Sequence, residues 1–242
     1  TNATDNGGNT GWAITGVAVS QRDLYWIGGS GNWTDGQHWS ESSGGAPYGC
    51  LPTATDNVYF DANSFSGPGQ VVTVNQLNQV ANNVDFTGVL HTPQFTSDSS
   101  FKVHGSLTLV ESMTWSGGLT FAGTAAGQTI TASGHALGGV TINGVGGAWQ
   151  LTGPTRVNSL SLTAGTLDTQ SYDLTIDTDM YSSNTNERSL LLGTSTVTLG
   201  SPLNVAWDTQ TTTNMTFDGD QATLIFTGYR AGCCGNYFKG GG

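Results

Sequence analysis

The sequence predicts an all-β protein, and within that class a β-solenoid in which successive coils of chain stack on one another. Helical spacing of apolar residues is absent over any long stretch. Short alternating strands recur instead, separated by Gly, Asn, Asp and Ser. A degenerate apolar–Thr–apolar unit also recurs, at a spacing of roughly 18 to 22 residues that is typical of one solenoid coil. A β-sandwich, which has strands every ~8–12 residues, is the alternative architecture.

Each repeat unit is expected to be a short strand with two apolar side chains pointing inward and one Thr pointing outward. Stacking then buries the apolar rows continuously, and Gly and Asn supply corners of positive φ. The predicted strands lie at 71–74, 83–86, 106–110, 119–121, 128–131, 139–142, 149–151, 159–162, 173–176, 196–199, 215–217 and 223–226.

The chain divides by composition into four predicted parts. Residues 1–23 are expected to be the end of a preceding module with a linker, and residues 24–66 an aromatic-rich cap. Residues 67–227 carry the solenoid repeats, and 228–242 form a Gly-rich tail.

Charge excludes one class of partner. Only 10% of residues are charged, against roughly 25% in an average soluble domain, and the net charge is −11. Binding to nucleic acid needs clustered bases, but the six here are scattered singly along the chain. No apolar run approaches the ~20 residues of a membrane helix, so membrane insertion is not expected either. The expected partners are neighbouring modules or other subunits, with surface glycans as an alternative.

The aromatic segment between residues 24 and 45 is the first candidate site. Tyr25, Trp26, Trp33, His38 and Trp39 surround a Gly-rich turn that would fold Trp26 back on Trp33. Large aromatics suit the covering of a solenoid's open end, which is the favoured interpretation. The alternative is a glycan-binding platform, because flat aromatic faces stack on sugar rings.

This segment also carries a resemblance. The stretch YWIGGSGNWTDGQHWSESSGG (25–45), followed by LPTATDNVYFDANSF (51–65), resembles the W-x-G-G-x-G-N-W-x-D-x-x-x-W segment of giant repeat-rich surface proteins of Bacteroidetes-type bacteria. Related segments occur in virion or tail-associated proteins of environmental phages, ahead of Thr- and Gly-rich β repeats. The resemblance implies a non-catalytic module of a larger extracellular protein, at a bacterial cell surface or on a virion.

Several acids are candidate Ca²⁺ ligands, although none matches an EF-hand loop or a Gly-Gly-x-Gly-x-Asp repeat. No cofactor is expected, and Ca²⁺ is the alternative, because Asp in β-turns commonly caps its own backbone. The candidates are Asp35, Asp56 and Asp61, then Asp177 with Asp179, and Asp218 with Asp220.

Catalysis is not expected. A sugar-cleaving solenoid would need two facing carboxyl groups about 5–10 Å apart. The three glutamates are Glu41, Glu111 and Glu187, and most aspartates stand in turn-like contexts. A polysaccharide depolymerase therefore remains only as an alternative.

The three cysteines are Cys50, Cys233 and Cys234, an odd number that cannot be fully paired within the chain. The two adjacent cysteines could bond to each other, or one could pair with Cys50 or with another chain.

Overall fold

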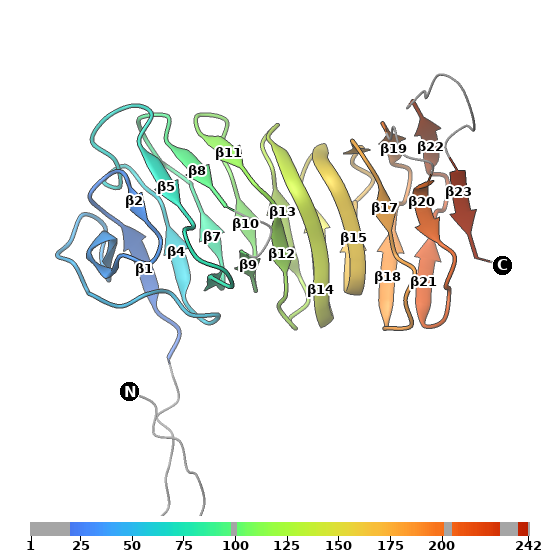
Figure 1. Ribbon diagram of the computed structural model, residues 1–242, viewed down its shortest axis with the longest axis horizontal. Coiled ribbons are helices and arrows are strands. Elements are labelled where there is room, and N and C mark those ends of the chain that lie inside the picture. Colours follow the sequence, from blue (N-terminus) through green and yellow to red (C-terminus); the bar gives the residue numbers. More distant parts are fainter. Residues whose placement is uncertain (1–19, 98–100, 201–204, 228–236, 242) are drawn as a thin grey trace, which may run out of the picture.

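The computed structural model describes residues 20–97, 101–200, 205–227 and 237–241. They form a β-solenoid of about seven turns with a buried aromatic cluster at its N-terminal end. Figure 1 shows the strands stacked one after another along the long axis of the molecule. The predicted fold class is thereby confirmed. A β-sandwich is excluded, because the strands pair in parallel with the equivalent strand of the next turn rather than forming two facing antiparallel sheets.

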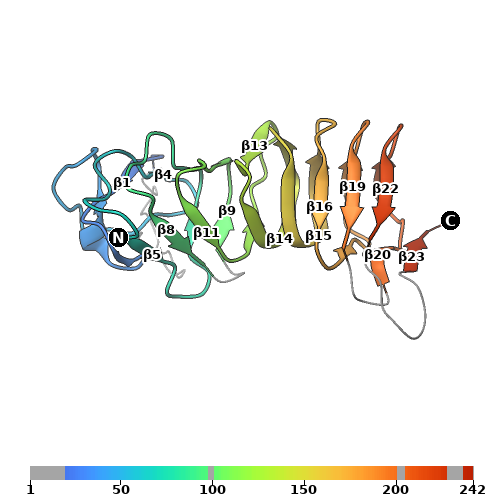
Figure 2. The same ribbon diagram turned by 90° about the horizontal axis from the view of Figure 1, so that it is seen from above.

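The strands fall into three columns that run along the stack, and Figure 2 shows the stack from a second side. The first column contains β1 (Asp23–Trp26), β4 (Asn57–Tyr59), β7 (Val84–Asp85), β10 (Leu107–Thr108), β13 (Gln128–Thr131), the ends of β14 (Ala136–Leu151) and β15 (Thr155–Asp168), β18 (Arg188–Leu191) and β21 (Met215–Asp218). The second contains β2 (Gly31–Asn32), β5 (Val71–Thr73), β8 (Gln94–Thr96), β11 (Thr114–Ser116), the starts of β14 and β15, β16 (Leu174–Ile176), β19 (Thr196–Leu199) and β22 (Thr223–Phe226). The third contains β6 (Val80–Ala81), β9 (Lys102–Val103), β12 (Leu119–Phe121), the middles of β14 and β15, β17 (Met180–Tyr181), β20 (Val205–Thr209) and β23 (Tyr237–Gly240).

The apolar–Thr–apolar units fill the core as the pattern predicts. In the first column Leu107 pairs with Val84 on one side and Ile130 on the other, and all three are buried. The neighbouring Thr108 and Thr131 pair with each other on the outer face. Burying each aliphatic side chain contributes about 1.5–3 kcal/mol before the entropy of ordering is subtracted, so the continuous inward rows supply the main stabilisation.

The parallel stack extends past both boundaries that the composition suggested. Within the predicted cap at 24–66, β4 already pairs in parallel with β1 and β7. Within the predicted tail at 228–242, β23 pairs in parallel with β20. The cap is therefore part of the solenoid's first turns, and its distinctive element is β3 (Trp39–Ser40), which pairs antiparallel with β1.

A ladder of glycines lies at the corner between the third and first columns. A Cβ at Gly123 would overlap the carbonyl oxygen of His104, one at Gly144 that of Gly123, and one at Gly165 that of Gly144. Gly123 and Gly144 do not have a positive φ. They are required because successive turns approach too closely there for any side chain, whereas the sequence pattern had suggested only a need for positive φ.

Gly144→Ala is therefore expected to destabilise the protein by about 3 kcal/mol, because the added methyl group would push against the Gly123 backbone and the Trp149 ring. Gly153→Ala is the control, since nothing lies within 4 Å of a Cβ there. Urea unfolding midpoints of the two variants test this. Equal shifts would show that the ladder carries no packing constraint.

Candidate functional site

The aromatic cluster at the N-terminal end is built by β1, β3 and the turn between them. The antiparallel pairing sets Trp26 opposite Trp39, and their rings meet edge to face with centroids 5.1 Å apart. Trp26 Nε1 donates to the carbonyl of Gly29 at 2.7 Å, and Trp39 Nε1 donates to the carbonyl of Trp33 at 2.9 Å. All three indoles are completely buried.

His38 closes this cluster on its outer side. Its ring stacks on Trp26 with centroids 4.7 Å apart and planes 4° from parallel. Its Nδ1 lies 2.6 Å from the carbonyl oxygen of Ile27. A Cβ on Gly31 would collide with the same ring, so the glycine is required for His38 to lie flat there.

These buried rings cannot form the glycan platform that the sequence left as an alternative. None of Trp26, Trp33 and Trp39 presents a face to solvent. Tyr25 is half-buried on the outer face of β1, where it stacks on Tyr59 with centroids 5.1 Å apart. Among the described residues the Trp33 Nε1 hydrogen has no hydrogen-bond partner, and the Trp33 ring lies edge-on to Phe101 with centroids 4.9 Å apart. The cluster therefore acts as a hydrophobic seal, that is, it separates the N-terminal end of the core from solvent.

We expect the six described tryptophans to be shielded from solvent. After Trp12→Phe, which removes the indole outside the described residues, the protein should emit at short wavelength and resist quenching by iodide. The physical reason is that the six remaining indoles are at most 6% exposed. Quenching as strong as that of free tryptophan would contradict the burial of the cluster.

The best-connected carboxylate of the described chain is Asp56. It is completely buried, and its two oxygens accept hydrogen bonds from the Arg22 backbone N, Nε and Nη2 and from the Thr53 N and Oγ1, at 2.5–3.1 Å. Burial on its own raises the pKa of Asp56, but the hydrogen bonds from Arg22 and Thr53 outweigh it and hold that pKa below its usual value. The same hydrogen bond raises the pKa of Arg22, so both partners are held in their charged forms.

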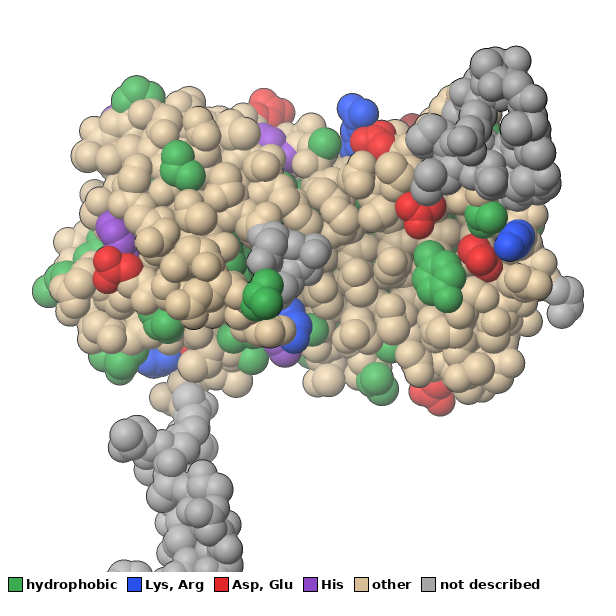
Figure 3. Space-filling view, viewed as in Figure 1, with side chains coloured by type: hydrophobic (Ala, Val, Ile, Leu, Met, Phe, Trp, Pro, Cys, Tyr) green, Lys and Arg blue, Asp and Glu red, His purple; other side chains and the backbone are tan. Residues whose placement is uncertain are grey.

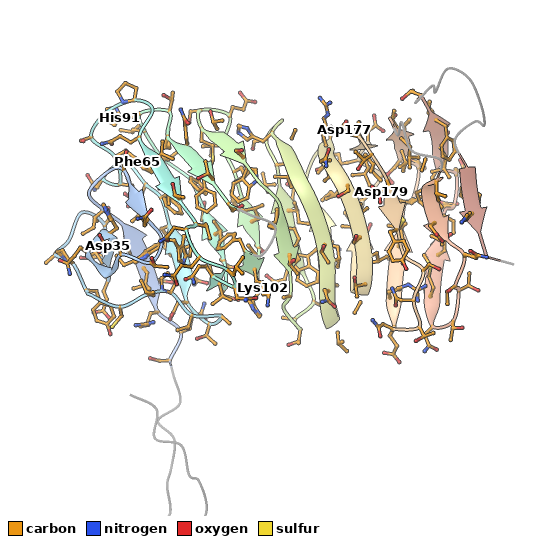
Figure 4. All side chains as sticks on the ribbon, in the orientation of Figure 1. Asp35, Phe65, His91, Lys102, Asp177 and Asp179 are labelled. Carbon is orange, nitrogen blue, oxygen red and sulfur yellow. The ribbon has the colours of Figure 1, made fainter. Side chains whose placement is uncertain are left out.

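Asp56 is thus engaged with Arg22 and does not serve as an open Ca²⁺ ligand. The other candidate acids also have local partners. Asp61 and Asp218 each accept from a backbone N–H two residues later, Asp35 does the same for Gln37, Asp177 pairs with Arg156, and Asp179 accepts from Thr178 Oγ1. In Figure 4, Asp35 lies at the cap end, whereas Asp177 and Asp179 lie in the other half of the stack.

Within the described ranges no three His, Cys, Asp or Glu residues gather in a way that could hold a metal ion. Asp35, Asp61 and Asp218 accept hydrogen bonds within their own turns, and Asp220, in the turn after β21, takes part through its backbone N–H, which donates to Asp218. These are the turn-capping roles that short polar side chains commonly take.

The three glutamates are distributed over separate parts of the fold. Glu41 follows β3, Glu111 lies between β10 and β11, and Glu187 precedes β18. Glu187 lines an open groove of about 410 Å³ together with Ser189, Asn214 and Thr216. Among the residues lining that groove it is the single carboxylate, whereas glycoside cleavage needs two.

Sequence reasoning missed the buried cation Arg188. Its guanidinium donates to the carbonyl oxygens of Ser182, Asn186, Thr211 and Thr213 and to Ser182 Oγ. Burial lowers the pKa of Arg188. The side chain joins the corner before β18 to the corner before β21, so it holds two neighbouring turns together. The sequence did contain a signal. Arg188 begins an apolar strand, at an inward-facing position where an apolar residue would be expected.

The structure describes only one of the three cysteines whose pairing the sequence left open. Cys50 is exposed and unpaired among the described residues. Cys233 and Cys234 lie outside the described residues. The pairing of these two cysteines with each other, with Cys50 or with another chain therefore stays a prediction.

The described chain contains no helix of the length and hydrophobicity that crossing a bilayer requires. No family model, no curated protein and no solved structure matches the chain. Its function must therefore be argued from its own geometry.

Proposed function

We propose that this chain is a structural or adhesive β-solenoid module of a larger extracellular protein, at a bacterial cell surface or on a virion. In this role it is a stiff spacer that holds neighbouring modules at a fixed separation. The observation that carries the proposal is the unbroken parallel stack, which continues from β1 to β23. The strands of the first column, from β1 to β21, are paired at eight successive steps of ~4.8 Å, which gives roughly 38 Å of rigid length.

The outer surface supports this role. Thr131 Oγ1 and Thr152 Oγ1 lie 2.7 Å apart on adjacent turns, and Ser106 Oγ bonds Gln128 Oε1 at 3.1 Å. Such hydrogen bonds link the turns from outside while apolar rows link them from inside. On the face of the molecule that Figure 3 shows, the charged side chains are scattered singly among uncharged ones. That surface favours contact with neighbouring modules over recruitment of a charged ligand.

A non-catalytic role is also part of the proposal. It is supported by the dispersed carboxylates and by Glu187, the single carboxylate among the residues that line the groove of about 410 Å³. The experiment is to incubate the full chain with a panel of bacterial polysaccharides and to measure reducing ends. We expect no release above the level of a heat-denatured sample. Release that depends on Glu187, and is lost in Glu187→Gln, would overturn the non-catalytic assignment in favour of a depolymerase.

The spacer role is tested by small-angle scattering. An elongated particle gives an asymmetric pair-distance distribution with a long tail, and this is the expected result for the stack. A symmetric distribution from a compact sphere would contradict the proposal.

A further inference from the structure

A polar groove crosses the corner between the third and first columns. A hollow of about 160 Å³ is lined by Gly146 of β14, by Gly165 and Thr166 of β15, and by residues 187–189. The groove of about 410 Å³ is lined by the same residues 187–189 and by residues 214–216. The two hollows adjoin at β18, so together they extend over the four strands β14, β15, β18 and β21. Three steps of ~4.8 Å between these strands give a length of roughly 14 Å.

This groove lies between paired strands. β18 pairs with β15 on one side and with β21 on the other, and β15 pairs with β14. Every residue of the corner, from β14 through the loops 182–187 and 210–214 to β21, belongs to the described ranges. The groove is therefore formed by contacts between neighbouring turns and not by the free edge of the last one.

The polar side chains along the groove have unused hydrogen-bonding capacity. The carboxylate of Glu187 is exposed and has no hydrogen bond or ion pair within the described part of the chain. Thr166, Ser189 and Thr216 stand in register on successive turns, and their hydroxyl groups have no partner among the described residues either. Elsewhere on this column several outward side chains bond to each other across the turns. A groove with such convergent free polar groups is suited to a ligand that forms many hydrogen bonds.

The buried Arg188 fixes the shape of the groove. Its five hydrogen bonds, which use all five N–H groups of the guanidinium, join the loop 182–187 to the loop 210–214. Among the residues that line the groove, Arg188 is the single cation, and none of its N–H groups is left for a ligand. An anionic ligand would therefore meet the carboxylate of Glu187 without a compensating positive charge. The groove is preorganised for an uncharged ligand.

An exposed aromatic ring stands at the start of the loop that ends at Glu187. Tyr181 is 45% exposed, and its hydroxyl donates to the carbonyl oxygen of Ser183 at 3.0 Å. This hydrogen bond holds the ring along the loop. A tyrosine ring combines a flat apolar face with a polar edge, and the C–H face of a sugar ring stacks on such a surface.

We propose that this groove binds an extended, uncharged glycan without cleaving it. Glu187 accepts hydrogen bonds from sugar hydroxyls, the row of Thr166, Ser189 and Thr216 donates and accepts them, and Tyr181 packs against a sugar ring. A peptide strand is disfavoured, because it needs an unpaired strand edge and β15 and β18 are paired on both sides. The inference rests on the proposed function and names the ligand class for its adhesive part.

The experiment is affinity electrophoresis of the full chain in native gels that contain one dissolved polysaccharide each. Dextran, mannan, xylan and laminarin are the neutral probes, and alginate is the anionic comparison. We expect migration to be retarded by at least one neutral polysaccharide and not by alginate. The apparent dissociation constant should rise about tenfold in Glu187→Ala and about fivefold in Thr166→Val, because each change removes hydrogen bonds to the sugar.

Matched variants outside the groove control for changes of charge and surface. Glu111→Ala removes another exposed carboxylate, and Thr108→Val removes the hydroxyl of another half-buried outward threonine on the first column. Tyr172→Ala is the control for Tyr181→Ala, since Tyr172 is 40% exposed in the turn after β15. We expect the three control variants to migrate as the native chain does and Tyr181→Ala to lose retardation. Circular dichroism confirms that each variant is folded.

The outcomes separate this inference from the proposed function. Migration that none of the four neutral polysaccharides retards overturns glycan binding, and an elongated particle in scattering then leaves the spacer role standing. Retardation that persists in Glu187→Ala, Thr166→Val and Tyr181→Ala overturns the assignment to this groove. Retardation by alginate as strong as by the neutral chains overturns the uncharged class of ligand. A compact sphere in scattering contradicts the spacer role, whereas retardation lost in Glu187→Ala still supports the groove.

Discussion

Trp39→Ala is expected to destabilise the protein by about 4 kcal/mol and to open its N-terminal turns first. The indole is completely buried, contacts Trp26 and Trp33 edge-on at 5.1 and 4.7 Å, and anchors its Nε1 on the Trp33 carbonyl. Its loss leaves a large cavity beneath β3, the strand that covers the edge of β1. Because each turn of a solenoid contacts only its neighbours, the damage should propagate from that end.

Hydrogen exchange measured strand by strand gives the readout. Amides of β1 and β4 should lose protection in Trp39→Ala, while those of β16 and β19 should keep it. Trp207→Ala is the matched control, because Trp207 is also an indole, is 1% exposed and lies near the opposite end. It should loosen β20 and β23 and spare β1. Uniform loss of protection in both variants would show that the solenoid unfolds as one unit and that the cluster is not a local seal.

The solenoid itself could be predicted from the sequence because its repeating unit is local. Leu119-Thr120-Phe121 specifies an inward, an outward and an inward position whatever its neighbours are. The pairing of that unit with Val140–Ile142 follows once the turns have similar length. The stack is therefore encoded in short strands whose alternation survives the degeneracy of the repeat.

The three-column arrangement could not be predicted in the same way. Corner geometry decides it, and corners are set by close backbone contacts such as that of Gly144 with Gly123. Nothing in a single sequence distinguishes a glycine needed for space from one needed for positive φ. The same limit applies to acids, because the sequence shows that Asp56 and Asp61 stand beside turns but not that Arg22 bonds to Asp56.

One overlooked signal would have located the Arg22–Asp56 pair. The segment Arg22-Asp23-Leu24-Tyr25-Trp26 aligns with Asp56-Asn57-Val58-Tyr59-Phe60, and the structure sets Leu24 beside Val58 and Tyr25 beside Tyr59. In that alignment the arginine falls next to the aspartate. This internal repeat would have predicted both the first parallel pairing and the ion pair that precedes it.

That ion pair makes stability depend on pH at the acid end. Asp56→Ala is expected to cost about 3 kcal/mol, because it leaves the guanidinium of Arg22 without its carboxylate. In a double-mutant cycle, Arg22→Ala combined with Asp56→Ala should cost clearly less than the two single changes added together. Asp177→Asn is the control, since its partner Arg156 is largely exposed and such pairs contribute about 0–1 kcal/mol.

The sign of the pH effect follows from the lowered pKa of Asp56. Below about pH 4 an unfolded aspartate takes up a proton, while the folded one still resists it, so the unfolded state binds more protons and gains stability. The contribution of Asp56 is therefore complete above about pH 4 and is lost as the pH falls toward its lowered folded value. Urea unfolding between pH 5 and pH 2 should show the gap between the native chain and Asp56→Asn closing as acid is added. If the difference in unfolding free energy between the two proteins stayed constant over that range, the pKa of Asp56 would not be lowered by folding. The Arg22–Asp56 pair would then not stabilise the contact between the first two turns.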